Sequence, residues 1–406
     1  METITVNTEK TVFGGDTIAK FDSKTIFIPF SMPNETLTVK ILQHKKDYDN
    51  AEIVKIESKS PYRVEPKCKY YTSCGGCNMM HIQSDYQKQL KIQMLEDIFL
   101  QNKIDIKGTV LLIDGPDFNY RSRFQLNNGG LSEKKSNNII PITQCECADE
   151  QINEYLKNTK FENRPQGRIQ VFGSNNIQNS QKVFLSNPTV KKNEQVYTKS
   201  NKKNKPKQKN YFAGTILSEE NKVTVQLLDK NITFDVRGFF QSNLHVYQKV
   251  INLIVDLLPG GQNILDMYAG CGSISAFLGK KYQNVTLVEH NRDALVFAEE
   301  NMKETPHVSY GLSGENWVKT CASFCPKFDA VVIDPPRSGM EKEVRDYLCK
   351  SKIPFICSLS CDPTTQARDI KELLENGYEI QKTYLLDFYP NTSHIESLVY
   401  LKLKVY

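Results

Sequence analysis

The fold is decided by the stretch Asn263-Ile264-Leu265-Asp266-Met267-Tyr268-Ala269-Gly270-Cys271-Gly272-Ser273. Its apolar first half is typical of a buried strand, and its glycines allow a tight turn before a helix that begins at Ile274. A strand, a glycine turn and a helix in this order bring the backbone close to a nucleotide-like ligand. The glycines do not form a clean Gly-x-Gly-x-x-Gly pattern, so the ligand has to be argued from the rest of the chain.

Polar side chains end the strands that follow this stretch. The strand at 285–288 runs into Glu289, an acid of the kind that hydrogen-bonds ribose hydroxyls. The strand at 328–333 runs into Asp334-Pro335-Pro336-Arg337. Helical segments alternate with most of these strands, which predicts a doubly wound α/β sheet.

A cysteine stands at the end of a further strand. The apolar run 353–356 leads to Ser358-Leu359-Ser360-Cys361-Asp362-Pro363, in which Pro363 should open the next helix. Ligands bind at the carboxyl ends of strands in such a sheet, so Cys361 is placed to act as a nucleophile once its thiolate is favoured. A free cysteine is more often a small buried hydrophobic residue, and only its neighbours argue for a chemical role.

The composition indicates a soluble globular protein of more than one domain. A chain of 406 residues is too long for one ordinary core, and 39% of the residues are hydrophobic and 24% charged. We expect a cytoplasmic protein, because no stretch is apolar enough for a membrane span and the N-terminus lacks a signal-peptide pattern. We also expect a monomer. Eleven cysteines in a reduced compartment indicate metal binding or catalysis before disulfides.

We predict three domains from the change of pattern along the chain. Residues 1–58 contain short alternating strands with turns such as Gly14-Gly15-Asp16, which favours a small closed barrel of the oligonucleotide-binding kind. Residues 59–237 form a mixed, β-rich central domain. Residues 238–406 form the α/β domain and end in a predicted hairpin around 391–393.

Basic residues in the central domain suit RNA phosphates. Residues 191–209 contain eight lysines and one acid, within a lysine-rich insert at 190–210. Arg121 and Arg123 lie on a predicted strand. The insert could equally be a solvated segment, and the arginines could decorate a solvent face, so both interpretations stay open.

Clustered cysteines open the central domain. Cys68, Cys74 and Cys77 form the pattern Cys-x5-Cys-Gly-Gly-Cys, and Cys145 is the best fourth ligand, with Cys147 close behind. Zinc and an iron–sulfur cluster both accept four cysteines. A zinc ribbon usually has two separated Cys-x-x-Cys pairs, whereas here one pair follows a longer gap and the fourth ligand is remote. We therefore favour a [4Fe-4S] cluster over zinc, and either over uncoordinated cysteines.

Taken together, the motifs resemble those of a known enzyme family. Asp266-x-Tyr-x-Gly-x-Gly, Glu289, Asp-Pro-Pro-Arg, Ser-Cys-Asp-Pro and His-Ile-Glu-Ser occur in the same order in the RNA 5-methyluridine methyltransferases, which use S-adenosylmethionine. The N-terminal segment resembles the TRAM domain, an RNA-binding barrel. The barrel and the cysteine pattern resemble the iron–sulfur branch that modifies 23S ribosomal RNA, and we expect transfer RNA members to lack both.

The resemblance implies roles for named residues. Cys361 would add to carbon 6 of uracil, and Glu396 would remove the proton from carbon 5 after methylation. S-adenosylmethionine would be held by Gln241, Tyr268, Ser273, Glu289, Ser313 and Asp334. An extruded base would reach Cys361 most easily from a loop or single strand.

Other functions remain open at this point. A transfer RNA uracil-5 methyltransferase would use the same chemistry on another substrate. A cytosine-5 methyltransferase would also use a cysteine, but the Pro-Cys signature common there is absent. A non-catalytic RNA-binding iron–sulfur protein would not need Cys361 and Glu396. An electron-transfer iron–sulfur protein would be expected to show a partner redox motif, and none is visible.

Overall fold

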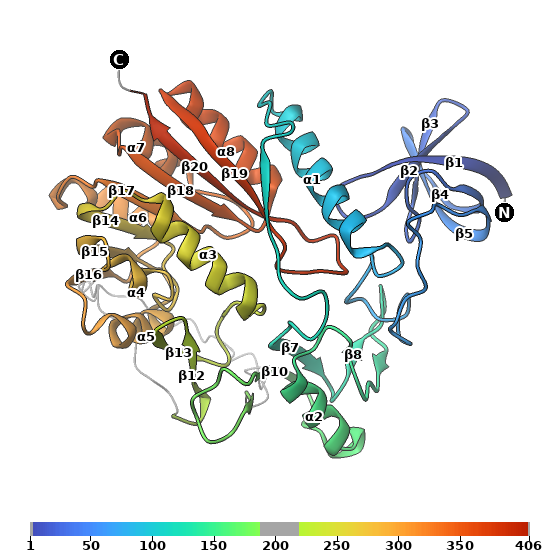
Figure 1. The fold of residues 1–406 in the computed structure, drawn as a ribbon, viewed down its shortest axis with the longest axis horizontal. Helices are drawn as coiled ribbons and strands as arrows, with labels where there is room; N and C mark the ends of the chain where they lie inside the picture. Colours follow the sequence, from blue (N-terminus) through green and yellow to red (C-terminus); the bar gives the residue numbers. More distant parts are fainter. Residues whose placement is uncertain (1–2, 187–218, 405–406) are drawn as a thin grey trace, which may run out of the picture.

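The architecture is described from a computed structural model of the chain, which places residues 3–186 and 219–404 (Figure 1). The lysine-rich insert predicted at 190–210 lies outside these described residues. Among the residues described, no helix is long and apolar enough to cross a membrane.

The N-terminal strands form a closed barrel with the order β1-β2-β3-β5-β4. The strands are β1 (Thr3–Thr11), β2 (Thr17–Phe21), β3 (Lys24–Ile28), β4 (Thr36–His44) and β5 (Tyr48–Ser58). Alternate residues of each strand point inward, so that Val6, Ile26 and Val39 share one core. The barrel predicted from this alternation is confirmed. Its base is fixed to the next segment by Arg63, which donates from Nε and Nη2 to the buried carboxylate of Glu35.

The C-terminal part is built on an eight-stranded sheet with the order β16-β15-β14-β17-β18-β20-β19-β6. The strands are β6 (Val110–Ile113), β14 (Gly261–Met267), β15 (Tyr282–Val288), β16 (His307–Tyr310), β17 (Ala330–Ile333), β18 (Phe355–Ser360), β19 (Tyr378–Leu386) and β20 (Glu396–Leu403). The strands from β16 to β18 are parallel, and β20 runs antiparallel to both of its neighbours. The predicted α/β fold and the terminal hairpin of β19 and β20 are confirmed.

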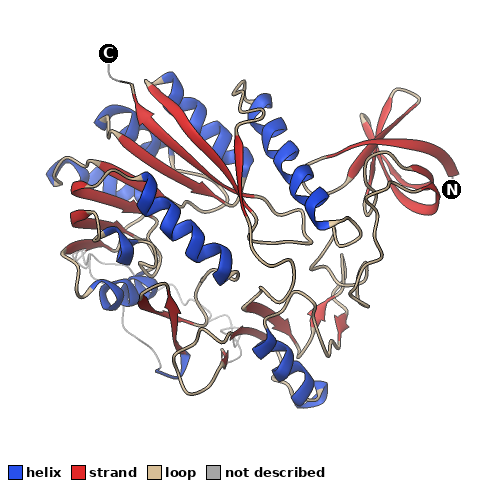
Figure 2. Ribbon diagram, in the orientation of Figure 1, coloured by secondary structure: helices blue, strands red, loops and turns tan. Residues whose placement is uncertain are grey.

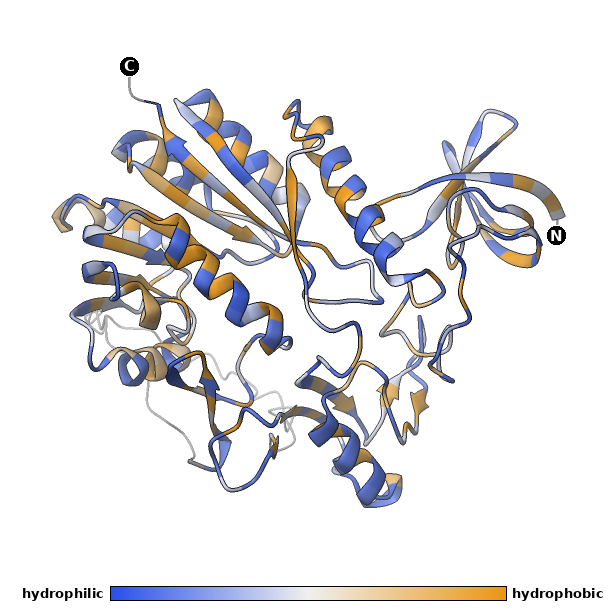
Figure 3. Cartoon of the chain, viewed as in Figure 1, coloured by the Kyte–Doolittle hydropathy of each residue, from blue (hydrophilic) through white to orange (hydrophobic). Residues whose placement is uncertain are grey.

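Helices cover both faces of this sheet, as in a doubly wound fold (Figure 2). One face packs on α3 (Leu244–Leu257), α4 (Ser275–Leu278) and α5 (Arg292–Met302). The other packs on α1 (Ser84–Gln101), α6 (Gly314–Thr320), α7 (Lys342–Ser351) and α8 (Pro363–Glu375). Figure 3 shows hydrophobic residues along the strands, and hydrophobic and hydrophilic residues alternating along α1 and α3. The buried face of α3 is apolar, whereas the buried face of α1 also contains Gln87 and Lys91.

The middle of the chain contributes to two places in the molecule. One part is a small β-rich unit with α2 (Glu150–Asn158), in which β11 (Val183–Leu185), β10 (Arg168–Gly173) and β7 (Arg123–Asn127) form a sheet beside the pair β8 (Leu131–Ser132) and β9 (Ile139–Ile140). The hairpin of β12 (Lys222–Leu227) and β13 (Lys230–Asp235) packs with the large sheet's core.

The segment from α1 to β6 belongs to the large sheet although it precedes the β-rich unit in sequence. Leu112 of β6 pairs with Leu385 of β19, and α1 buries Leu90 and Phe99 against the helices of that face. The predicted range 59–237 is therefore divided between the small β-rich unit and the large sheet with its helices. The domain boundaries at 58 and 237 remain predictions.

Candidate active site

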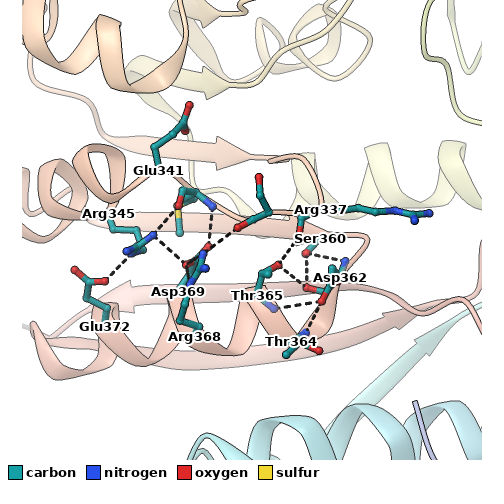
Figure 4. A network of polar contacts seen from close by, with 12 residues as sticks. Arg337, Glu341, Arg345, Ser360, Asp362, Thr364, Thr365, Arg368, Asp369 and Glu372 are labelled. Atoms are coloured by element: carbon teal, nitrogen blue, oxygen red, sulfur yellow. Dashed lines mark hydrogen bonds and ion pairs between the residues drawn. The ribbon is translucent and has the colours of Figure 1, made fainter. Parts of the chain in front are cut away.

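Cys361 lies at the carboxyl end of β18, directly before α8. The carboxylate of Asp362 caps this helix by accepting hydrogen bonds from the amides of Thr364 (2.9 Å) and Thr365 (3.3 Å), and Pro363 is the first helical residue (Figure 4). The cap fixes the turn in which Cys361 stands. The thiol is half-buried.

Glu396 is the first residue of β20, the strand next to β18, and lies beside Cys361. The last pair of the antiparallel ladder between β18 and β20 is Ser360 with Ser397, so one step further the register brings Cys361 opposite Glu396, whose charge acts on the thiol. Because β20 runs antiparallel to β18, its first residue lies at the end of the sheet formed by the carboxyl ends of the parallel strands. The structure therefore brings the two predicted catalytic residues together.

Burial and neighbouring acids control the protonation of this pair. Burial, with the charges of Glu396 and Asp334, raises the pKa of Cys361 to about 11, while Arg337 lowers it by charge and by a hydrogen bond. Burial, with the charge of Asp334, raises the pKa of Glu396 to about 8, and Arg337 again acts in the opposite direction. Perturbed pKa values of this kind are typical of functional sites.

Three of the predicted cofactor residues meet at the ends of adjacent strands. Tyr268 follows β14, Glu289 follows β15 and Asp334 follows β17. The backbone of Tyr268 has φ +67°, and its amide donates to the carbonyl of Val288 (2.8 Å). The carboxylate of Glu289 accepts from the amides of Gly270 (2.9 Å) and Asn291 (2.6 Å), which leaves the acid anchored at the mouth of the turn.

The other three predicted cofactor residues lie in different surroundings. The Oε1 atom of Gln241 is buried and has no hydrogen-bond partner among the residues that the structure describes. The Ser273 hydroxyl already bonds the Tyr247 hydroxyl (2.5 Å). The Ser313 hydroxyl caps α6 by accepting from the amide of Asn316 (3.3 Å). Of these three, Gln241 is thus the residue whose side-chain oxygen accepts no hydrogen bond from the described part of the chain.

Two residues at this edge received no role from the sequence. Asp266 is buried, accepts a hydrogen bond from Ser275, and has its pKa raised to about 7 by burial, with further effects from Asp334 and Glu289. Arg337 follows Asp334 in the Asp-Pro-Pro-Arg stretch, and its carbonyl accepts from Thr365 (Figure 4). In the sequence, Asp266 is marked only as the first residue of Asp-x-Tyr-x-Gly-x-Gly and Arg337 only as the last residue of Asp-Pro-Pro-Arg.

The cysteines of the central segment line one cavity of about 400 Å³. Its walls include Cys68, Cys74, Cys77, Cys145 and Cys147. The sulfur atoms of Cys77 and Cys147 are 3.7 Å apart, and the Cys145 thiol is within hydrogen-bonding reach of Cys147. Within residues 3–186 and 219–404, no three His, Cys, Asp or Glu side chains are already arranged to hold a metal ion. The donors fit a thiolate-bound centre in number and type, and Cys145 and Cys147 are both near enough to supply the fourth ligand.

A groove of about 400 Å³ joins the barrel to the loop that precedes Glu396. Its walls include Phe27 of the barrel, Lys134 and Lys135 of the turn between β8 and β9, and His394. Lys134 also lies over the ring of Phe30, 3.9 Å from its centroid. Cations and an aromatic ring along one groove are the surface that a nucleic acid strand requires.

Arg121 lines the cysteine cavity, and both Arg121 and Arg123 are engaged with the protein. Arg121 donates to the carbonyl of Arg123 (3.1 Å) and stacks over Phe124, and Arg123 donates to the carbonyl of Gly238 (2.8 Å). Burial lowers the pKa of Arg123. These contacts favour a structural role for Arg123.

Comparisons with known proteins agree with this arrangement. The tRNA (Uracil-5-)-methyltransferase family model matches residues 322–404, and the methyltransferase small domain matches residues 249–350. An "Uncharacterized RNA methyltransferase" of Treponema denticola is 36% identical over 97% of this chain and 97% of that protein. The 23S rRNA (uracil(1939)-C(5))-methyltransferase RlmD of Shewanella sediminis is 28% identical over 98% of this chain and 96% of that protein. The chain belongs to the RNA (uracil-5-)-methyltransferase family.

The fold of this RNA (uracil-5-)-methyltransferase is shared with an archaeal structure. The tRNA (uracil-54, C5)-methyltransferase of Pyrococcus abyssi, solved with S-adenosyl-L-homocysteine, matches with a TM-score of 0.72 and 21% identity over 98% of this chain and all of that chain. An alignment of this extent includes the barrel. The expectation that transfer RNA members lack the barrel is therefore wrong for the Pyrococcus abyssi enzyme. The presence of a barrel thus does not distinguish an enzyme that acts on ribosomal RNA from one that acts on transfer RNA.

Proposed function

We propose that this chain transfers a methyl group from S-adenosylmethionine to carbon 5 of a specific uridine in 23S ribosomal RNA, through a covalent bond between Cys361 and carbon 6 of uracil. The observation that carries the proposal is the placement of Cys361 opposite Glu396 at the ligand-binding edge of the sheet. A nucleophile facing a base suits a reaction in which one group adds to the ring and the other removes a proton.

Cys361 starts the reaction as a thiolate. Its sulfur bonds to carbon 6, and the electron pair of the carbon 5–carbon 6 double bond moves into an enolate whose charge reaches carbon 5. Burial raises the pKa of the thiol to about 11 and so favours its neutral form, whereas the charge of Arg337 favours the thiolate, and the thiol proton passes to solvent when the thiolate forms. When bound, S-adenosylmethionine would supply the methyl group to carbon 5 from its sulfonium sulfur, and S-adenosylhomocysteine would leave as the neutral thioether.

Glu396 completes the reaction as the base. Its carboxylate removes the proton from the methylated carbon 5, the electrons of that bond re-form the double bond, and the Cys361 thiolate leaves. A pKa raised to about 8 makes this carboxylate a stronger base than an ordinary glutamate. Glu396 returns its proton to solvent before the next turnover.

The acids at the sheet edge support a cationic ligand. Burial raises the pKa of Asp334 to about 6, and burial together with the charges of Asp334 and Glu289 raises the pKa of Asp266 to about 7. A positive charge brought among them would relieve this cost, and S-adenosylmethionine carries one on sulfur and one on its ammonium group. Gln241 Oε1 offers a buried, free acceptor to such a ligand. Tyr268, Glu289 and, with their hydroxyls already engaged, Ser273 and Ser313 complete the proposed pocket.

The groove between the barrel and His394 supports RNA as the other substrate. Lys134 and Lys135 suit phosphates, and Phe27 suits an unstacked base. His394 stands two residues before Glu396, so a strand in this groove would pass the catalytic edge. A cytoplasmic, monomeric enzyme remains the prediction.

The RlmD relative supports 23S ribosomal RNA as the substrate, and the archaeal tRNA enzyme supports transfer RNA as the second candidate. The test is to incubate the chain and labelled S-adenosylmethionine with purified 23S ribosomal RNA and transfer RNA that lack 5-methyluridine, and to map the product by mass spectrometry. Label only in transfer RNA would overturn the choice of substrate. Label in neither RNA would leave a non-catalytic RNA-binding protein.

We further propose that Cys68, Cys74, Cys77 and Cys145 hold a [4Fe-4S] cluster with a structural role, with Cys147 as the alternative fourth ligand. The cavity lined by these thiols supports the proposal. Protein purified without oxygen should then be brown. Colourless protein with one zinc per chain would overturn it. Loss of the colour in Cys145→Ser but not in Cys147→Ser would identify Cys145 as the ligand.

A further inference from the structure

Tyr268 occupies a backbone conformation that bulky residues rarely adopt. Its φ of +67° lies in the left-handed region, where a side chain crowds the following carbonyl. Such a conformation persists only when surrounding contacts hold it, and it is common at ligand-binding sites. The contact that holds the ring end of Tyr268 is a short hydrogen bond from its hydroxyl to the carboxylate of Glu341.

Glu341 can hold Tyr268 because its own loop is fixed to α8. The amide of Met340 donates to Asp369 of α8 (2.8 Å), and Thr365 of α8 donates to the carbonyl of Arg337 (3.1 Å). Figure 4 shows the Glu341 side chain pointing away from the network around Asp369. Its carboxylate is therefore not used by that network and is available to Tyr268.

Gly314, the first residue of α6, lies against the same hydrogen bond. A Cβ atom at Gly314 would stand 3.2 Å from the Tyr268 hydroxyl, 3.0 Å from the Glu341 carboxylate and 2.6 Å from Val344. The absence of a side chain at 314 thus lets three loops meet at one point. These are the loops that carry Tyr268, Ser313 and Asp334, three residues of the proposed cofactor pocket.

We infer that Glu341 is a positioning residue for the cofactor: its hydrogen bond to Tyr268 holds the turn after β14 in the shape that binds S-adenosylmethionine. The inference rests on the proposed function, because it concerns the pocket assigned there. Glu341 itself need not touch the ligand. It acts through Tyr268 and ties the turn to the loop that carries Asp334.

The test measures the dissociation constant of S-adenosylmethionine by titration calorimetry on the full chain without RNA. Glu341→Ala and Tyr268→Phe should each weaken binding about tenfold, the loss expected for a hydrogen bond to a charged group. The double variant should be no weaker than the single variants, because all remove the same bond. Glu341→Gln keeps an acceptor oxygen and should lose less than about threefold.

The matched control is Glu343→Ala, which removes an acid two residues away that pairs with Lys319 at the surface and should leave the constant within about twofold. The KM for RNA should not change in any variant. Unchanged cofactor affinity in Tyr268→Phe, which removes only one oxygen atom and should fold, would overturn the inference. Wild-type chain that binds no S-adenosylmethionine would overturn the proposed function and this inference with it, so the two failures are distinguishable.

Discussion

Replacing Glu396 by glutamine should stop the reaction after methyl transfer, with the enzyme still attached to its RNA. Glutamine keeps the shape of the side chain but cannot accept the proton from carbon 5, and loss of a general base slows a step by about 10²- to 10⁴-fold. Addition should not be slowed, since the charge of Glu396 is one of the causes that raise the pKa of Cys361. A covalent RNA–protein complex should therefore accumulate.

The pH dependence of release gives a second, quantitative prediction for the same residue. With a pKa of about 8, Glu396 is a carboxylate in about a tenth of molecules at pH 7 and in about nine tenths at pH 9. A base works only when deprotonated, so release of methylated RNA from the wild-type adduct should become about tenfold faster over this interval and then level off. The glutamine variant should show no such rise.

The assay follows label from S-adenosylmethionine into a protein–RNA band on a denaturing gel after rapid quenching. Glu379→Gln is the matched control, because Glu379 is an exposed acid of β19 at the end of the sheet opposite to the active site, where it pairs with Lys402. Cys361→Ala should form no band. Release from Glu396→Gln at the wild-type rate would refute the assignment of Glu396 as the base.

Three other predictions follow from charges in the chain. The Nζ atom of fully buried Lys91 lies 2.6 Å from Asp387, so Lys91→Met leaves a buried charge unpaired and should cost about 3–5 kcal/mol. Circular dichroism should show a melting temperature lower by about 10 °C, largely restored by adding Asp387→Leu, and an unchanged value would contradict the role of the pair. Arg337→Leu should raise the pKa of Cys361 further and shift the pH profile of adduct formation upward by about one unit, and an unshifted profile would show that Arg337 does not assist the thiolate. Deleting residues 199–209 should weaken RNA binding mainly at low salt. If the deletion variant and the wild-type chain bind RNA equally well at every salt concentration, the insert does not contribute to RNA binding.

Local patterns predicted the strands and the edge of the sheet at which they end. Apolar runs marked β14, β15, β17 and β18, and turn residues marked their ends, so the common position of Glu289, Asp334 and Cys361 followed from the rules of open α/β sheets. Glu396 came from the resemblance of its motif to a known family. Its position opposite Cys361 depends on the reversal of β20, which the predicted hairpin already implied.

Long-range pairing could not be predicted in the same way. β6 pairs with β19, which lies far away along the chain, and periodicity carries no information about partners at that distance. The buried pair of Lys91 and Asp387 was invisible for the same reason, because a lysine on a helix is usually exposed. The left-handed backbone of Tyr268 is set by contacts with other loops, and no local signal marks a tyrosine for that conformation.

The reversal of β20 also decides which end of the catalytic sheet can be modified in the laboratory. The strand begins at Glu396, beside the reactive thiol, and runs to Leu403 at the opposite end of the sheet, where it pairs with Tyr378. Residue 404, the last one that the structure describes, therefore lies at the end of the sheet remote from the chemistry, and an affinity tag or a fluorescent protein can be attached beyond it. Such a fusion offers a handle for pulling covalently trapped RNA out of cells with the site left open.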